Sequence, residues 1–140
     1  WHGMSGSGAR VEVDGATDLV ARLTWDVHGE PDVDLQAVIV DNRGRIIDAA
    51  CYNNTKACSN RAVVHVSSQP GQEQIVAKLA EIPAAVHVIL FLVHKFRGGV
   101  LQDSTGVVSV EQQQQQGDEL RTLLSSPLAG CCGPALAPSG

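Results

Sequence analysis

Short apolar segments, each about the length of one β-strand, recur along most of the chain. They are rich in Val, Ile and Leu or alternate apolar with polar residues, and turn-forming Gly, Pro, Asn and Asp separate them. No stretch before residue 118 keeps helical periodicity over about ten residues. The pattern predicts a mainly all-β fold, an antiparallel β-sandwich of two sheets joined by turns and short helical segments. The expected strands are residues 11–13, 19–25, 35–40, 45–50, 62–66, 74–79, 86–93 and 106–110.

Turn signals between the segments predict which strands pair. The Asp, Asn and Gly of residues 41–44 predict a hairpin that joins the strands on either side. Residues 67–71, which contain Pro70 and Gly71, are expected to form a loop within a second strand pair.

Three further segments have distinct expected roles. The apolar run at residues 86–93, interrupted only by His87, favours a strand buried on both faces or at the centre of a sandwich. Residues 81–85 are expected to form a brief turn. The glutamines at residues 112–116 are expected to form a surface loop between strands.

A chain of 140 residues has the size of a single domain, and its 44% hydrophobic and 18% charged residues are typical of a globular protein. Residues 1–8 are expected to be a flexible segment or a cloning scar, and residues 129–140 a flexible tail rich in Gly, Pro and Ala. The sandwich domain is therefore expected at residues 9–128. The whole chain could also be one module of a larger protein or assembly.

Charge and hydropathy exclude several classes of partner. A net charge of −5 disfavours nucleic acid as the main ligand, because binding to phosphates draws on an excess of Lys and Arg. No apolar stretch approaches the roughly 20 residues of a membrane span. The N-terminus lacks the pattern of a signal peptide, so a cytoplasmic location is expected.

The four cysteines do not have the spacing of a zinc site. Neither Cys51 with Cys58 nor the adjacent Cys131 and Cys132 forms a Cys-x-x-Cys motif. Free thiols are expected in the reducing cytoplasm, and the role of Cys131 and Cys132 stays open.

Several acids gather between the second and third expected strands. Asp26, Glu30, Asp32 and Asp34 lie in one short stretch, where their oxygens could converge on a hard cation. Calcium needs six to eight oxygen ligands, so these residues supply only part of a shell. The residues alone favour a solvated acidic loop between strands over a cation site.

Short motifs follow one another along the chain in an order typical of one family. They are Leu23-Thr24-Trp25-Asp26, Asp32-Val33-Asp34 before an apolar strand, Asp41-Asn42-Arg43-Gly44, Tyr52-Asn53-Asn54, Val63-Val64-His65, Ile82-Pro83-Ala84-Ala85-Val86 and Gly117-Asp118-Glu119-Leu120-Arg121. In this order and spacing, over roughly residues 10 to 125, the chain resembles the TerD family of tellurium-resistance and stress-associated proteins. The resemblance implies a β-sandwich with calcium held in loops at one end, roles in stress response and tellurite resistance, and no established catalytic chemistry.

The resemblance also implies a set of metal ligands. By position, Asp32 and Asp34 would be the retained calcium ligands, with Asp26 beside them. The family's second ligand segment is acidic, but here the residues after His65 keep only Glu73 as an acid. Because the lost carboxylates tune calcium affinity, the resemblance implies a degenerate site that is lost or weak, with a Kd of about 10⁻⁴–10⁻³ M. Calcium, weakly held, is the one cofactor expected.

Two hypotheses about function follow, and an enzyme is not expected. The first is a non-catalytic binding or scaffolding module with an unidentified protein partner. The alternative is a functional calcium-binding module, whose acidic loop orders or docks an anionic ligand when calcium binds. His65 with Ser67 and Ser68 lacks the motifs of a hydrolase, so a structural histidine is expected there. His87 and His94 are likewise expected to be satisfied sheet histidines.

Overall fold

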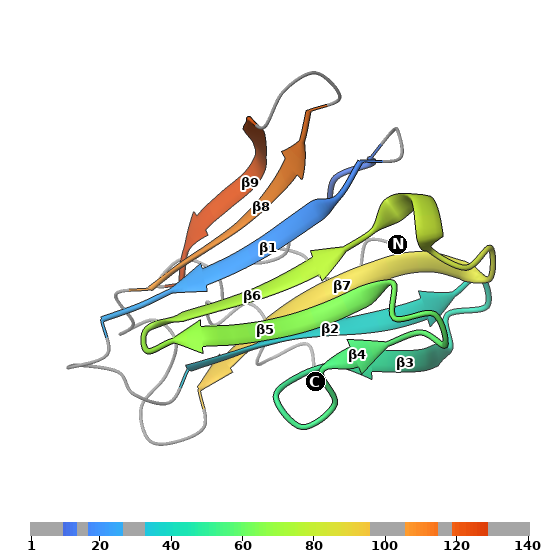
Figure 1. The fold of residues 1–140 in the computed structure, drawn as a ribbon, viewed down its shortest axis with the longest axis horizontal. Coiled ribbons are helices and arrows are strands. Elements are labelled where there is room, and N and C mark those ends of the chain that lie inside the picture. Colours follow the sequence, from blue (N-terminus) through green and yellow to red (C-terminus); the bar gives the residue numbers. More distant parts are fainter. Residues whose placement is uncertain (1–9, 14–16, 27–32, 96–105, 115–118, 129–140) are drawn as a thin grey trace, which may run out of the picture.

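The computed structural model describes residues 10–13, 17–26, 33–95, 106–114 and 119–128, apart from the side chains of Ser68 and Lys95. Its strands form two antiparallel sheets that pack face to face, which confirms the predicted all-β sandwich (Figure 1). Among the described residues, the larger sheet has the order β4-β5-β6-β1-β8-β9 and the smaller one the order β3-β2-β7. The strands are β1 (Leu19–Thr24), β2 (Val33–Asp41), β3 (Ile46–Ala50), β4 (Lys56–Ala57), β5 (Val63–Gln69), β6 (Gln72–Ala77), β7 (Val86–Lys95), β8 (Val107–Gln113) and β9 (Leu120–Pro127).

The core lies between the two sheets and follows the alternation of side chains along each strand. On β1, Leu19, Ala21 and Leu23 are buried, while the residues between them are partly exposed. The inward row of β6 contains Ile75 and Ala77, and it begins with Glu73. The Glu73 carboxylate therefore lies in the core, because alternate residues of a strand point to the same face and Glu73 alternates with Ile75 and Ala77.

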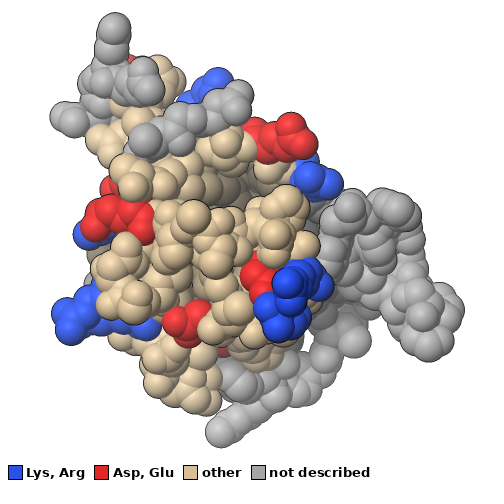
Figure 2. All heavy atoms as spheres, turned by 90° about the vertical axis from the view of Figure 1, so that its right-hand side faces the viewer, with Lys and Arg blue, Asp and Glu red and all other residues tan. Residues whose placement is uncertain are grey.

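The predicted β2–β3 hairpin is confirmed, and the side chain of Asp41 holds its turn together. Asp41 Oδ1 accepts hydrogen bonds from the backbone N–H groups of Arg43 and Arg45, both at 2.9 Å. Gly44 has a φ of +78°, which suits a residue without a Cβ. Figure 2 views the sandwich from the right-hand side of Figure 1, and the acidic and basic residues on that face are scattered among uncharged ones. The described residues of that face therefore form no single-sign patch for a polyanion.

The expected burial of the apolar run at residues 86–93 is wrong. Among the described strands β7 pairs only with β2, and it stands last in the order of its sheet. Its odd-numbered Ile89, Phe91 and Val93 pack against the core, whereas Leu92 is 40% exposed. The central strand is β2, which is buried at nearly every position. An unbroken apolar run does not distinguish a strand buried on both faces from one with a single buried face.

Three smaller expectations also need correction. Residues 11–13 form no strand, although Val13 packs against the core. Strands β5 and β6 extend through most of the expected 67–71 loop and leave only Pro70 and Gly71 as a tight turn, with Gly71 at a φ of +76°. The turn expected at residues 81–85 begins earlier, as the 3-10 helix η1 (Leu79–Glu81).

The expected glutamine loop is also partly strand. Gln112 and Gln113 belong to β8, and Gln112 is buried at 6% exposure. Gln115 and Gln116 lie outside the described residues. A run of identical residues conceals the strand, since it shows no alternation of apolar and polar residues.

Substituting Gly106 tests the close packing at the start of β8. An alanine Cβ there would lie 2.7 Å from Leu128 Cδ1 and 2.9 Å from the carbonyl oxygen of Thr24, and the backbone atom cannot easily move away. We expect Gly106→Ala to lower the free energy of unfolding by about 1–3 kcal/mol in urea denaturation. Gly44→Asn is the control, because no atom lies within 4 Å of its Cβ position and asparagine tolerates a positive φ. Equal losses in the two variants would contradict the packing argument.

Candidate functional site

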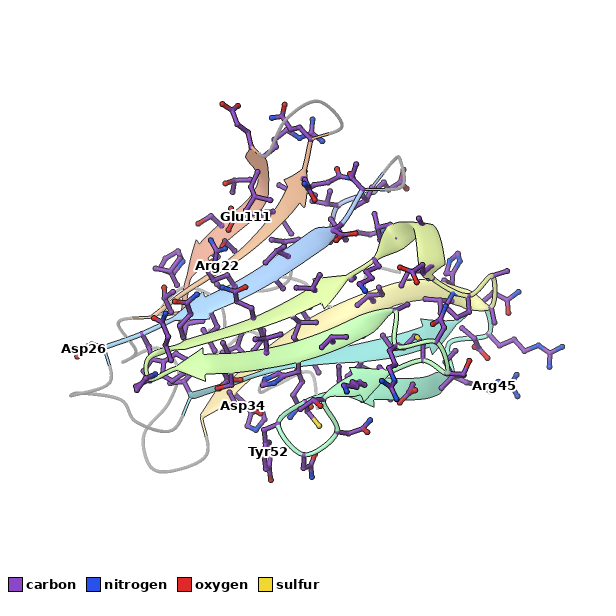
Figure 3. The ribbon with its side chains drawn as sticks, in the orientation of Figure 1. Arg22, Asp26, Asp34, Arg45, Tyr52 and Glu111 are labelled. Carbon is purple, nitrogen blue, oxygen red and sulfur yellow. The ribbon has the colours of Figure 1, made fainter. Side chains whose placement is uncertain are left out.

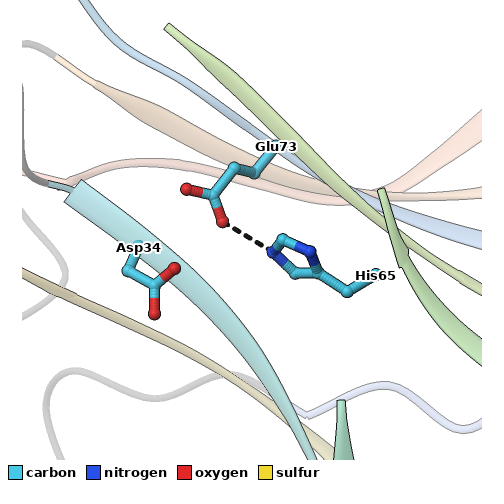
Figure 4. Close-up of side chains that lie close together, drawn as sticks. All are labelled: Asp34, His65 and Glu73. Carbon is cyan, nitrogen blue, oxygen red and sulfur yellow. Dashed lines mark hydrogen bonds and ion pairs between the residues drawn. The ribbon is translucent and has the colours of Figure 1, made fainter. Parts of the chain in front are cut away.

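Three ionisable side chains meet in the interior of the sandwich. Asp34 comes from β2 of the smaller sheet, while His65 of β5 and Glu73 of β6 come from neighbouring strands of the larger sheet (Figure 4). One donor atom from each residue lies within 4.8 Å of the other two. All three residues are buried, with exposures of 3%, 4% and 8% in chain order. We call these three residues the interlayer group.

The pairing of β5 with β6 brings two members of the interlayer group together. His65 is opposite Ile75 in the register, so Glu73 lies two residues away in the same inward row. The tight turn at Pro70 and Gly71 keeps both side chains in adjacent strands of one hairpin.

Glu73 is the satisfied carboxylate of the group. His65 Nε2 lies 2.7 Å from Glu73 Oε1, and the backbone N–H of Leu35 donates to the same oxygen at 3.2 Å. Burial alone would raise the pKa of Glu73, but the hydrogen bonds from His65 and Leu35 outweigh it and lower the pKa. Glu73 is therefore the ionised carboxylate, and His65 donates to it from Nε2.

Asp34 is the carboxylate with one unsatisfied oxygen. Burial, and then the charge of Glu73, raise the pKa of Asp34 to about 6. Its Oδ2 atom is buried and has no hydrogen-bond partner within the described part of the chain. His94 Nε2 lies 3.9 Å from that atom, and the His94 side chain is 40% exposed. A hydrogen bond with Glu73 raises the pKa of Asp34 further, whereas the charge of His94 and a hydrogen bond with Gln36 lower it by less. Because burial dominates, Asp34 destabilises the fold when it ionises.

The expected calcium ligands are only partly brought together. Asp34 and Glu73 lie in the interlayer group, whereas Asp26 is exposed beyond the end of β1 and lies away from Asp34 (Figure 3). Asp32 lies outside the described residues. The sequence predicts the third member, His65, as a structural histidine and not as a metal ligand. His65 lies two residues after the buried Val63, which is the spacing of two side chains on the same face of a strand, here the core face.

The remaining candidates lie apart from the interlayer group. Ser67 and His87 are exposed, and Cys51 and Cys58 are free thiols of intermediate exposure. Burial, followed by the charge of Asp48, raises the pKa of the Cys58 thiol, so this thiol is a poor nucleophile. Cys131 and Cys132 lie outside the described residues.

The interlayer group could hold a metal ion, but its donors do not complete a calcium shell. They comprise two carboxylates and one imidazole nitrogen. Calcium takes six to eight oxygen ligands and does not favour imidazole. Within the described residues, the donor set is therefore too small and partly of the wrong kind for tight calcium binding.

Comparison with known proteins identifies one family. The family model described as TerD domain matches residues 6–114, which is most of the chain. The search of curated proteins found no match to the chain. The match includes β1 to β8 and the whole interlayer group, whereas β9 and the motif at residues 117–121 lie beyond it. Within the described residues, no helix has the length and apolarity of a membrane span.

Proposed function

The chain belongs to the TerD family, and we propose that it acts in the cytoplasm as a non-catalytic binding or scaffolding module related to stress response and tellurite resistance. Its calcium site is weak or lost, and it acts through a protein partner. Family membership supports the stress-related role, and the interlayer group supports the loss of calcium dependence.

The observation that carries the proposal is the bond between His65 and Glu73. Glu73 Oε1 accepts a hydrogen bond from an imidazole at 2.7 Å and from the Leu35 N–H at 3.2 Å, so this carboxylate is already stabilised without calcium. These two donors link β5, β6 and β2 across both sheets without a cation. The module is therefore expected to fold and to bind its partner in the presence of a chelator.

One observation favours the alternative of a functional calcium-binding module. Asp34 has a buried oxygen without a hydrogen-bond partner within the described residues, and a cation beside it would lower its pKa. In that alternative, calcium binding draws Asp26 and Asp32 toward Asp34 and so orders the acidic loop, which then docks an anionic ligand.

Calcium titration during thermal unfolding separates the two proposals. A site with a Kd of about 10⁻⁴–10⁻³ M gains at most about 0.4 kcal/mol at 0.1 mM free calcium, so we expect almost no change in Tm against chelator. A gain near 2.7 kcal/mol would indicate a Kd roughly 100 times below the calcium concentration and would favour the alternative. If such a gain vanished in Asp32→Asn with Asp34→Asn, the acidic loop would be its source.

A further inference from the structure

The interlayer group has the donor chemistry of a first-row transition metal site. Zinc sites combine imidazole with carboxylate oxygen at about 2.0–2.2 Å, so their donors lie roughly 3–4 Å apart. The donor atoms of Asp34, His65 and Glu73 lie within 4.8 Å of one another before any ion is bound. Side-chain movements of about an ångström would bring all three into coordination range. Zinc can be held by three protein ligands, with a water molecule in the fourth position.

A second observation points to a cation at the same place. The Asp34 side chain is 4% exposed, and its Oδ2 atom lacks a hydrogen-bond partner in the described part of the chain. Figure 4 shows the Asp34 carboxylate facing the Glu73 and His65 pair from the opposite sheet. The interlayer group contains two acids and no Lys or Arg, so a dication would compensate the buried charge that the protein leaves unbalanced.

His94 supplies a further donor beside the interlayer group. Its Nε2 atom lies 3.9 Å from Asp34 Oδ2, and its side chain is 40% exposed. His94 therefore places an imidazole that solvent reaches beside the buried Asp34 carboxylate. Imidazole and carboxylate donors together suit divalent first-row metal ions.

We propose that the interlayer group binds a divalent first-row transition metal ion, with Asp34, His65 and Glu73 as ligands, His94 as the nearest further donor and Zn²⁺ as the probe ion. The same residues disfavour calcium, because His65 offers a nitrogen ligand. A metal ion would bind the lone pair of Nε2, so the proton on Nε2 is released to solvent and Nδ1 carries the N–H of the bound imidazole. This metal site goes beyond the proposed function, and its failure leaves the calcium-independent module unaffected.

Titrating the full chain with Zn²⁺ and, separately, with Ca²⁺ tests the proposal. We expect one Zn²⁺ per chain in calorimetry and a rise in Tm of roughly 10 °C at about 100 times the Kd, reversed by chelator. Calcium at the same concentration should leave Tm unchanged. A calcium response equal to the zinc response, or no zinc response, would overturn the proposal.

Substitutions place the ion in the interlayer group rather than at a surface thiol or histidine. Asp34→Asn keeps the size of the side chain and should weaken Zn²⁺ binding by at least 10–100-fold, as should His65→Gln. His87→Gln, at an exposed histidine of β7, and Cys51→Ser are controls that should bind Zn²⁺ as the unaltered chain does. Unchanged affinity in Asp34→Asn would exclude this site. So would thiolate-to-metal charge-transfer absorption after Co²⁺ is added, since it would show cysteine ligands.

Discussion

Asp34→Asn is expected to stabilise the folded protein at pH 7 in the presence of chelator, by about 1–2 kcal/mol. Burial and the charge of Glu73 raise the pKa of Asp34 to about 6, from an ordinary value of 3.8. Between these two values the folded state binds more protons than the unfolded state, so this carboxyl makes stability fall as pH rises from about 4 to 6. Each unit of pKa shift corresponds to about 1.4 kcal/mol of stability. The expected gain is smaller than the full shift implies, because the neighbouring His94 side chain is 40% exposed and solvent screens the charges there.

Urea denaturation at pH 7 and pH 4 measures this effect, and Asp41→Asn is the matched control. Both acids lie on β2 and are buried, but the backbone N–H of Arg45 and further hydrogen bonds lower the pKa of Asp41. Asp41→Asn should therefore destabilise at pH 7, and that loss should shrink as pH falls through the lowered pKa. The gain in Asp34→Asn should disappear near pH 4, where Asp34 is already protonated. A variant at Asp34 that is less stable at pH 7 would contradict the charge argument.

Much of the fold could be predicted because strands and turns have recognisable local sequence patterns. The β2–β3 hairpin follows from three turn-forming residues between apolar runs, and the two-sheet class follows from the period of the strands. The position of β7 could not be predicted in this way. Strand order depends on pairing between distant segments, and nothing within residues 86–93 records that β2 is their neighbour.

The same distinction applies to the candidate site: its residues could be named from the sequence, but their contacts could not be predicted. The resemblance to the family pointed to Asp34 and Glu73, but each residue seen alone is an acid near a turn. Their contact requires two sheets to pack with β2 over β6, and His65 joins them only through the β5–β6 register. The alternation of Val63, His65 and of Glu73, Ile75 does contain the signal, since it places both polar side chains on the core face. Asp26 shows the converse, because closeness in sequence to Asp34 did not bring it into the interlayer group.

The residue that follows β9 is part of the core, although its neighbours in the sequence resemble a tail. Ser125, Ser126 and Pro127 have the composition of a tail, yet they belong to β9, and Leu128 directly after them is fully buried. The Leu128 N–H donates to the carbonyl oxygen of Gly106 at 2.8 Å, and its side chain belongs to the core cluster. A residue at the end of the predicted domain therefore helps to close the interior.

Leu128→Ala is accordingly expected to lower the free energy of unfolding by about 2–5 kcal/mol, the range for leucine removed from a packed core. Leu120→Ala, at the start of the same strand, is the control, because Leu120 is 38% exposed and its truncation should cost well under half as much. Urea denaturation of the full chain measures both, with m-values showing whether the surface exposed on unfolding is unchanged. Similar, small losses in the two variants would mean that the end of β9 is not part of the cooperative fold. A large loss in Leu128→Ala alone would show that a residue beyond the matched family region, which ends at residue 114, stabilises the sandwich.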